Sequence, residues 1–284
     1  MADRDLTGKV ALVTGANTGI GAVTARVLAE RGAGVILACR TRARAQPVLD
    51  TIAAAGGDAH FVELDLGSLA SVRACAAAVL ARDEPLHLLI NNAGLAGHRG
   101  VTADGFEIQF GVNHLGHFLL TMLLVDRLKA SAPARIVNVA SIAHYKPRAI
   151  DYAKLRQKTP TTVGVKEYEV SKLANVLFTA ELARRLRGTG VTNYALHPGV
   201  IASDVWRRIP WPIRPLVKRR MITVEKGALT TLHCATAPLE QLVDGGYYDR
   251  CAEREPNPAA KDEAAAAELW RRSLEWGELS SSPV

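Results

Sequence analysis

Short runs of β-branched and other apolar residues recur along the chain, separated by Ala- and Leu-rich stretches of helical length. The runs cover residues 10–14, 35–39, 60–64, 86–90, 135–139 and 191–196. They are apolar almost throughout instead of alternating, which is typical of strands covered on both faces. The pattern therefore predicts a doubly wound α/β fold, in which helices lie on both faces of a parallel sheet.

The rhythm of strands and helices continues to about residue 200 without an internal repeat or a linker. It therefore predicts a single domain over residues 1–284. A polar stretch at 142–165 and a proline-rich basic stretch at 206–220 interrupt the rhythm, and both are expected to be insertions on a regular core. A last helix is expected over residues 262–276, where an acidic first turn suits the helix dipole.

Length and composition narrow the class of protein. The 284 residues are 48% hydrophobic and 22% charged, which excludes collagen-like, disordered and disulfide-scaffold proteins. The four cysteines are too far apart for a zinc or redox motif, so free thiols in a reducing compartment are expected. The N-terminus lacks the apolar core of a signal peptide, and no later apolar run approaches the roughly 18 residues of a membrane span. We therefore expect a cytoplasmic protein.

A glycine-rich turn follows the first predicted strand. Residues 14–21 read Thr-Gly-Ala-Asn-Thr-Gly-Ile-Gly, and a helical pattern begins at Ala22. Glycines in such a turn let the backbone approach a pyrophosphate, whose charge the helix N-terminus stabilises. The spacing differs from the GxGxxG fingerprint, because the glycines stand at the first, fifth and seventh places. The setting between a strand and a helix nevertheless favours a dinucleotide site over an ordinary tight turn.

The end of the second predicted strand indicates which dinucleotide is bound. A carboxylate there binds the ribose 2′-hydroxyl of NAD, whereas an arginine accommodates the 2′-phosphate of NADP. Arg40 follows the strand, and no acidic residue comes before Asp50. The sequence therefore favours NADP(H), with Arg40 as the phosphate contact. Arg42 and Arg44 add positive charge nearby, and their alternative interpretation is as solvated helix residues.

Polar residues also follow later strands, at the edge where open α/β sheets bind ligands. Asp65 follows the third strand and Asn-Asn-Ala-Gly, residues 91–94, follows the fourth. Pro198 and Gly199 end the sixth strand, with Ser203 behind them, and backbone groups there suit a nicotinamide carboxamide. Taken alone, residues 91–94 are an ordinary polar turn, and their place in the series favours a ligand site.

Four residues are candidates for the chemistry. Tyr168 and Lys172 share one face of a predicted helix, and an ammonium beside a phenol is expected to lower the pKa of Tyr168 from about 10 into a range useful for proton transfer. Ser141 ends the fifth strand, where its hydroxyl can hold a carbonyl oxygen. Asn113 lies inside a predicted helix, where asparagine is mildly unfavourable. It either caps a local bend or holds water in a proton relay to Lys172.

Together these motifs resemble the short-chain dehydrogenase/reductase family over about residues 8–248. Within the family, the chain is similar to the retinol dehydrogenase and WW-domain oxidoreductase group. Residues 15–21, 102–107, 112–118, 171–178 and 197–200 carry the resemblance. It implies a single-domain Rossmann-type fold and a catalytic tetrad of Asn113, Ser141, Tyr168 and Lys172. The membrane anchor usual in vertebrate retinol dehydrogenases of this type is not expected here.

The cofactor contacts follow from the motifs and the resemblance together. They are Gly15, Asn17, Thr18, Gly19, Ile20, Gly21, Arg40, Asp65, Leu66, Asn91, Ala93, Gly94, Tyr168, Lys172, Pro198, Gly199, Val200 and Ser203.

The expected activity is hydride transfer between NADP(H) and the carbonyl or alcohol of a small apolar substrate. Ser141 is expected to polarise the oxygen, Tyr168 to supply the proton, and Lys172 to lower the tyrosine pKa and hold ribose hydroxyls. Retinoids, lipid aldehydes, steroids and aromatic or polyketide ketones all stay open as substrates. A catalytically idle, dinucleotide-sensing protein is the alternative, and such a protein is expected to have lost part of the tetrad.

Nearly all of the net charge of +7 arises in one segment. Residues 206–220 hold six basic residues and no acidic one, and without those six the chain has 29 basic and 28 acidic residues. We expect a substrate lid over about residues 200–225. Its basic residues are either only solvated or dock on an anionic membrane or an acidic carrier domain. No recognition motif indicates nucleic acid.

Two further expectations concern metals and assembly. His114, His117 and His197 are expected to be packed histidines and not metal ligands, because no acidic or cysteine partner stands at ligand spacing. Helices that start near Gly105 and Glu167 correspond to those through which the family commonly dimerises. A homodimer is therefore possible from the resemblance, and the sequence leaves the oligomeric state open.

Overall fold

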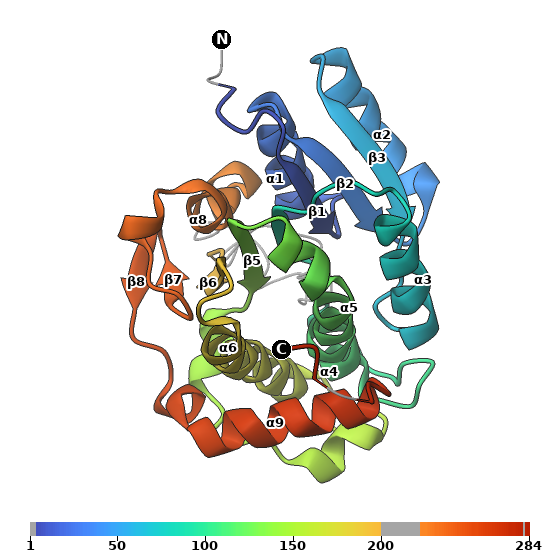
Figure 1. Ribbon diagram of the computed structural model, residues 1–284. Helices are drawn as coiled ribbons and strands as arrows, with labels where there is room; N and C mark the ends of the chain where they lie inside the picture. Colours follow the sequence, from blue (N-terminus) through green and yellow to red (C-terminus); the bar gives the residue numbers. More distant parts are fainter. Residues whose placement is uncertain (1–3, 200–221, 281) are drawn as a thin grey trace.

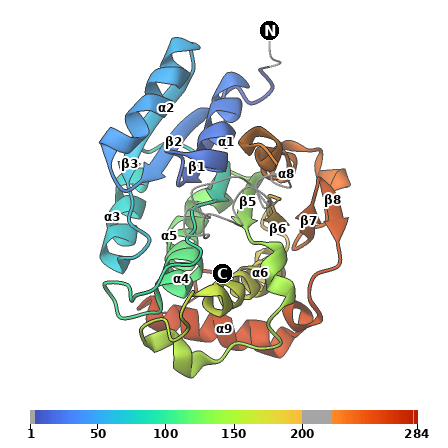
Figure 2. The same cartoon turned by 180° about the vertical axis from the view of Figure 1, so that it is seen from behind.

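A single eight-stranded sheet organises the computed structural model, which describes residues 4–199, 222–280 and 282–284. The strand order is β3-β2-β1-β4-β5-β6-β7-β8 (Figures 1 and 2). Every neighbouring pair is parallel except β7 and β8. The strands are β1 (Val10–Thr14), β2 (Gly34–Cys39), β3 (Asp58–Glu63), β4 (Leu88–Asn91), β5 (Ala134–Val139), β6 (Val191–His197), β7 (Tyr247–Asp249) and β8 (Ala252–Arg254). The predicted doubly wound α/β fold is confirmed.

Helices cover both faces of the sheet, and each face has its own apolar core. One layer holds α1 (Gly19–Glu30), α2 (Arg42–Ala54) and α8 (Val224–Thr236). The other holds α3 (Leu69–Leu80), α5 (Gly116–Ala130) and α6 (Val165–Leu186). Because side chains on both faces of β1, β2, β4 and β5 are buried, these strands are apolar throughout. This burial is the physical reason that their positions could be read from the sequence.

Shorter elements lie between the main ones. They are α4 (Ile108–Phe110), a π-helical turn η1 (Gly111–Leu115), and the 3₁₀ turns η2 (Ile142–Tyr145), η3 (Tyr152–Arg156), η5 (Leu239–Gln241) and η6 (Pro258–Lys261). The predicted insertion at 142–165 contains η2 and η3. Strands β7 and β8 have three residues each, which is too short for an apolar run, and they were not predicted.

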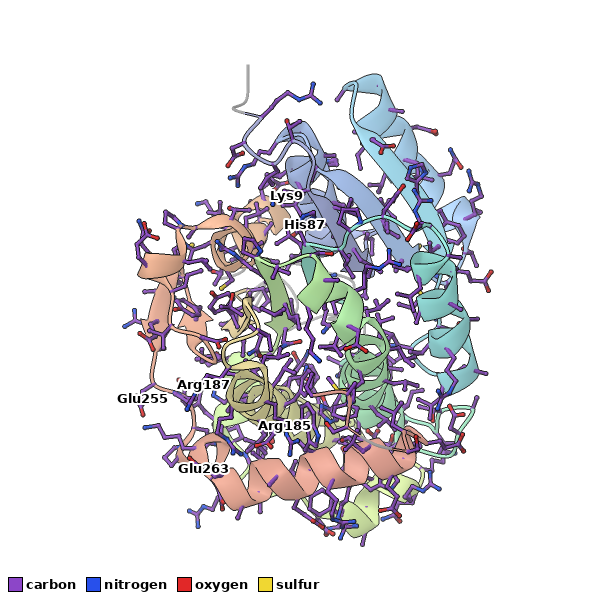
Figure 3. The ribbon with its side chains drawn as sticks, in the orientation of Figure 1. Lys9, His87, Arg185, Arg187, Glu255 and Glu263 are labelled. Atoms are coloured by element: carbon purple, nitrogen blue, oxygen red, sulfur yellow. The ribbon has the colours of Figure 1, made fainter. Side chains whose placement is uncertain are left out.

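The last helix, α9 (Glu263–Trp276), lies across α6 and contacts α5 as well (Figure 1). Trp270 is buried at this junction, with its ring stacked on Phe178 and edge-on to Phe118. The guanidinium of Arg185, beside α9 in Figure 3, lies 4.5 Å from the centre of the Trp270 ring. Helix α9 therefore covers part of the two helices that are expected at a dimer interface, and the homodimer stays a prediction.

One continuous helical stretch, Ile108–Ala130, is long and apolar enough to cross a membrane by length and composition. No such stretch was expected from the sequence, because no apolar run in it approaches the roughly 18 residues of a membrane span. In the fold, 83% of its most apolar window is buried, so its apolar side chains serve the core between the sheet and α9.

The expected lid at 200–225 falls largely outside the described residues. Val200, Ser203 and the basic segment 206–220 are all in that part of the chain. At the end of this range α8 begins at Val224, and Thr223 caps the helix through its hydroxyl. The single-domain assignment for residues 1–284 stays a prediction.

Candidate active site

The four predicted catalytic residues come together at the carboxyl edge of the sheet. Ser141 stands two residues after β5, Tyr168 and Lys172 lie in the first two turns of α6, and Asn113 lies in η1 before α5. Strand β5 lies between β4 and β6, so the loop that carries Ser141 opens at the middle of this edge. Such an edge is where open α/β sheets bind ligands.

Ser141 and Tyr168 are in direct contact. Their side chains form a hydrogen bond, and Ser141 is only 7% exposed. The serine hydroxyl accepts a hydrogen bond from the backbone N–H of Ala143 at 3.2 Å, and the Ser141 carbonyl accepts one from Nδ1 of His144 at 2.7 Å. Two hydroxyls thus face each other with the serine held from two sides.

The amine of Lys172 is buried beneath Tyr168. Its Nζ donates to the carbonyl of Val139 at 2.8 Å and lies 5.7 Å from the centre of the Tyr168 ring. Burial disfavours the ammonium form and lowers the pKa of Lys172 from 10.5 to about 7. At neutral pH the side chain is therefore close to the midpoint of its titration.

The expected effect on Tyr168 is wrong in direction. Burial raises the pKa of its phenol above the usual 10, and the hydrogen bond to Ser141 opposes this shift only in part. The prediction assumed a fully charged ammonium beside the ring, whereas burial partly discharges Lys172. Tyr168 is therefore a protonated phenol at neutral pH, which is the form that can donate to a carbonyl.

Asn113 is buried, and both atoms of its amide are engaged. Oδ1 accepts from the Leu95 N–H at 2.7 Å, while Nδ2 donates to the Leu95 carbonyl and the Ser171 hydroxyl, each at 2.9 Å. A β-carbon on Gly94 would lie 3.3 Å from Oδ1 of Asn113 and 3.6 Å from Nζ of Lys172. The side chain therefore ties the π-helical turn to Leu95 and to Ser171 of α6, and the proton relay to Lys172 stays a prediction.

The glycines of the turn after β1 have different physical roles. A β-carbon on Gly21 would lie 2.5 Å from Nδ2 of Asn92 and from the Gly15 carbonyl, so glycine there allows close packing of α1. Gly19 has φ +57 and nothing within 4 Å of its β-carbon position, and it begins α1. The turn thus presents open space at a helix N-terminus, where a pyrophosphate fits. Asn17, Thr18 and Ile20 flank that space.

Asn91 differs from its expected role. Its side chain is 2% exposed, and Nδ2 donates to Thr121 Oγ1 at 3.0 Å and to Asn138 Oδ1 at 2.9 Å. The side chain therefore belongs to the core between α5 and β5, and a cofactor contact is left to backbone groups and to Ala93 and Gly94.

The other expected cofactor residues differ in their exposure to solvent. Arg40 is exposed directly after β2, and Asp65 is exposed while its carboxylate accepts from the Gly67 N–H at 2.9 Å. Leu66 is 6% exposed and packs in the core. Pro198 and Gly199 follow β6. Gly199 has φ +92, and a β-carbon on it would collide with Ile222.

The sequence did not predict that Thr14 and His117 support the site. The Thr14 hydroxyl accepts from the backbone N–H groups of Asn92 and Ala93 at 2.9 and 3.0 Å, and it lies 2.9 Å from Nε2 of His117. Thr14 is the polar end of an otherwise apolar strand, directly before Gly15. That position was the available signal.

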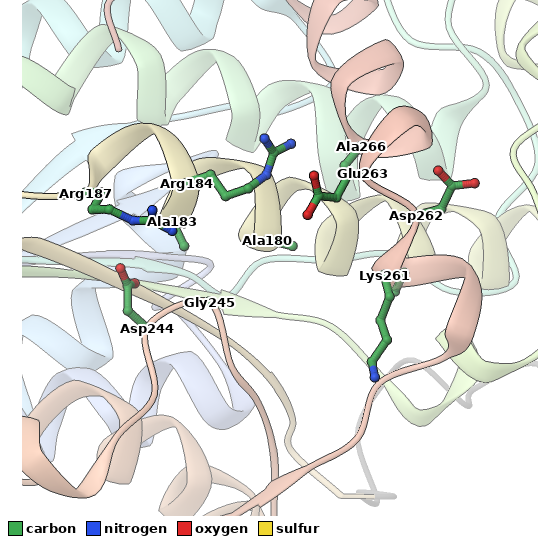
Figure 4. A pocket seen from close by; sticks show the side chains of 11 residues that line it. Ala180, Ala183, Arg184, Arg187, Asp244, Gly245, Lys261, Asp262, Glu263 and Ala266 are labelled. Carbon is green, nitrogen blue, oxygen red and sulfur yellow. The ribbon is translucent and has the colours of Figure 1, made fainter.

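A concavity formed by described residues lies elsewhere. Its volume is about 370 Å³, and its lining includes Arg184, Arg187, Asp244, Lys261 and Glu263 (Figure 4). It lies at the last turn of α6, roughly 16 Å along the helix from Lys172. Charges of both signs line it, and we assign it no part in the chemistry.

No group of three or more His, Cys, Asp or Glu side chains among the described residues could hold a metal ion. His114 and His117 lie in one helical stretch, yet they face different partners. His114 meets the Ser273 hydroxyl of α9, whereas His117 meets Thr14 of β1.

Comparison with known proteins agrees with this geometry. A sequence model of the family described as short chain dehydrogenase matches residues 9–153. Human retinol dehydrogenase 12 is 46% identical over 279 residues, which are 95% of this chain and 86% of that protein. The chain belongs to the short-chain dehydrogenase/reductase family. Its sequence places it in the retinol dehydrogenase-like subgroup, as the resemblance predicted.

Solved structures show the same fold. An uncharacterised protein from Mycobacterium paratuberculosis superposes with a TM-score of 0.81 at 35% identity, covering 98% of this chain and 96% of that one. An angucycline C-6 ketoreductase with bound NADP superposes with a TM-score of 0.68 at 26% identity, covering 87% and 95%. Members of the family are oxidoreductases that use nicotinamide dinucleotides, so this chain is a dehydrogenase or reductase.

The burial of Lys172 predicts an unusual dependence of stability on pH. A lowered pKa in the folded state means that stability is lost as the pH falls from about 10.5 towards 7, because only the unfolded chain keeps the proton there. At pH 7, Lys172→Met should therefore have a larger free energy of unfolding than the wild type, by a few kcal/mol at most. It should unfold at a higher denaturant concentration. The gain should shrink as the pH approaches 10.

Lys226→Met is the control, because this lysine is exposed on α8. Denaturant unfolding of both variants across this pH range is the measurement. A gain for Lys172→Met that does not change with pH would contradict the assignment of a buried, partly discharged amine.

Proposed function

We propose that the protein is an NADP(H)-dependent oxidoreductase that transfers hydride between the nicotinamide and the carbonyl or alcohol of an apolar substrate. The observation that carries this proposal is the contact of the Ser141 and Tyr168 hydroxyls above the buried amine of Lys172. Such a set can hold a carbonyl oxygen and deliver a proton to it.

The residues around the glycine turn fit a dinucleotide. The open position at Gly19 and the N-terminus of α1 suit the pyrophosphate. Arg40 is exposed at the end of β2 and supplies a cation for a 2′-phosphate. Backbone groups of residues 92–94 and of Pro198 and Gly199 would hold the nicotinamide half. Bound there, the cofactor supplies or accepts the hydride.

The chain's own residues handle the proton and the oxygen. Ser141, held by the Ala143 N–H and by His144 through its carbonyl, would fix the substrate oxygen near the Tyr168 hydroxyl. Tyr168 is protonated at neutral pH because burial raises its pKa, so it can give its proton to that oxygen. Lys172 has a pKa near neutrality and can return a proton towards Tyr168, with Asn113 beside it.

A raised tyrosine pKa favours one direction of the reaction. Reduction needs the phenol, whereas oxidation of an alcohol needs a group that accepts its proton. We therefore propose ketone or aldehyde reduction as the direction at neutral pH.

The substrate class is proposed from apolar exposure near the site. Ile142, Val163 and Val165 are between 50% and 61% exposed, and all three lie between Ser141 and Tyr168 in the chain. The named activity of the similar human protein, retinol dehydrogenase 12, supports a retinoid. The ketoreductase similarity supports an aromatic or polyketide ketone. A catalytically idle dinucleotide sensor is disfavoured because all four tetrad positions are filled.

Three further parts of the proposal are not tested by the described residues. A cytoplasmic location, a homodimer, and docking of segment 206–220 on an anionic membrane or an acidic carrier domain stay predictions. Docking predicts salt-dependent binding that is lost when the basic residues of the segment are neutralised.

Tyr168→Phe tests the proton donor. The variant loses the hydroxyl that meets Ser141 and should lower carbonyl turnover by about 10²-fold or more. Its Kd for NADPH, measured by fluorescence, should stay close to that of the wild type. Tyr152→Phe is the control, because Tyr152 packs against Trp276 of α9. Near-normal turnover in Tyr168→Phe would refute the assigned role.

Arg40→Asp tests the cofactor preference. Replacing the cation by a carboxylate should raise the KM for NADPH by about tenfold or more, since a charge-assisted contact is lost, and lower the KM for NADH. Arg44→Asp, a few residues further on the exposed side of α2, is the matched control. An NADPH preference that survives in Arg40→Asp would assign the phosphate contact to another residue.

A further inference from the structure

His117 is a buried histidine of α5 whose two ring nitrogens both have partners. It is 3% exposed. Nδ1 lies 3.1 Å from the carbonyl oxygen of Asn113, and Nε2 lies 2.9 Å from the hydroxyl of Thr14. One ring therefore spans from the helical turn that carries a tetrad residue to the end of β1, where the glycine turn begins.

The direction of each hydrogen in this chain of contacts follows from the balance of donors and acceptors. The Asn113 carbonyl can only accept, so Nδ1 of His117 carries the hydrogen. The Thr14 hydroxyl accepts from two backbone N–H groups, at Asn92 and Ala93. Its own hydrogen then goes to the unprotonated Nε2 at 2.9 Å in preference to the Ile90 carbonyl at 3.3 Å. The order is Thr14 to His117 to Asn113.

This order requires a neutral imidazole. A protonated ring would place a second N–H against the Thr14 hydroxyl, which has no free lone pair to accept it. Burial lowers the pKa of His117 to about 4, and Lys172 opposes protonation as well, while the Asn113 carbonyl favours it. His114, the other titratable group packed near it, is itself neutral, with its pKa lowered to about 3 by burial.

The two residues that His117 connects, Thr14 and Asn113, each hold another part of the candidate active site. Thr14 precedes Gly15 and holds the backbone of residues 92 and 93. Asn113 holds both backbone groups of Leu95 and the hydroxyl of Ser171, one residue before Lys172. A single imidazole thus connects the glycine turn, the segment after β4 and the start of α6.

We propose that His117 is a positioning residue that fixes Asn113 relative to the glycine turn and so keeps the proton-handling residues in register with the dinucleotide. The inference rests on the proposed function for its kinetic consequence, but the bridge itself is a property of the free protein. His114 shows the contrast, because it is equally buried and packs among Phe110, Phe118 and Phe178.

Two substitutions of His117 each remove one of its two hydrogen bonds and keep the other. His117→Asn places an amide nitrogen near the former Nδ1, which keeps the donor to Asn113 and removes the acceptor for Thr14. His117→Gln reaches the former Nε2, which keeps a partner for Thr14 and removes the donor to Asn113. His114→Gln is the matched control, since it changes a buried histidine of the same helical stretch whose contacts are aromatic rings, Ser273 and Asn175.

The expected result is a split between two measurements. His117→Asn should raise the Kd for NADPH by about tenfold and lower kcat by less, whereas His117→Gln should lower kcat by about tenfold and raise the Kd by less. His114→Gln should lower Tm without changing the Kd for NADPH and kcat by different factors. Equal changes of Kd and kcat in both His117 variants, or the pattern of His114→Gln, would overturn the positioning role.

The tautomer gives a test that does not need turnover. Nitrogen-15 NMR of the free protein should show His117 protonated at Nδ1 alone between about pH 6 and 9. Protonation at Nε2, or an imidazolium, would overturn the bridge. If Tyr168→Phe keeps full turnover, the proposed function fails by itself, and the NMR and Kd measurements still decide whether His117 connects Thr14 to Asn113.

Discussion

The hydrogen bond from the Lys172 amine to the Val139 carbonyl is the interaction on which the site depends. It places a titratable nitrogen at the end of the central strand β5, where burial lowers its pKa to about 7. Tyr168 lies one helical turn earlier, and Ser141 follows two residues after Val139 in the chain. The geometry of one helix against one strand end thus sets three of the four candidate catalytic groups. A buried amine destabilises the fold, and such a feature persists where function requires it.

A buried layer of polar side chains supports this arrangement from within the sheet. Asn91 donates to Thr121 and Asn138, Asn138 donates to Thr179, and Thr179 donates to the Asn175 carbonyl. These residues tie β4 and β5 to α5 and α6. Each paired amide or hydroxyl group of this kind favours one arrangement, because leaving that group unpaired costs about 1 to 3 kcal/mol. The His117 bridge belongs to the same layer and extends it to β1.

Particular residues show how far the sequence predicts this molecule. The run at 10–14 became β1 with the same bounds, because burial on both faces demands continuous apolar residues. The tetrad could be named from motifs, since their order along the chain is specific. Three-dimensional burial could not be read in this way. In the folded protein the Asn91 side chain lies in the core, and burial raises the pKa of Tyr168 where a lowered pKa was expected. It also gave His117 two partners that are distant or unremarkable in sequence.

Turnover of a panel of ketones and aldehydes, followed by the loss of NADPH absorbance at neutral pH with NADH in parallel, tests the central claim most directly. The account predicts reduction of at least one apolar carbonyl compound, faster with NADPH than with NADH. Tight binding of either dinucleotide with no reduction of any retinal, lipid aldehyde, steroid or aromatic ketone, and no oxidation of the matching alcohols, would contradict it.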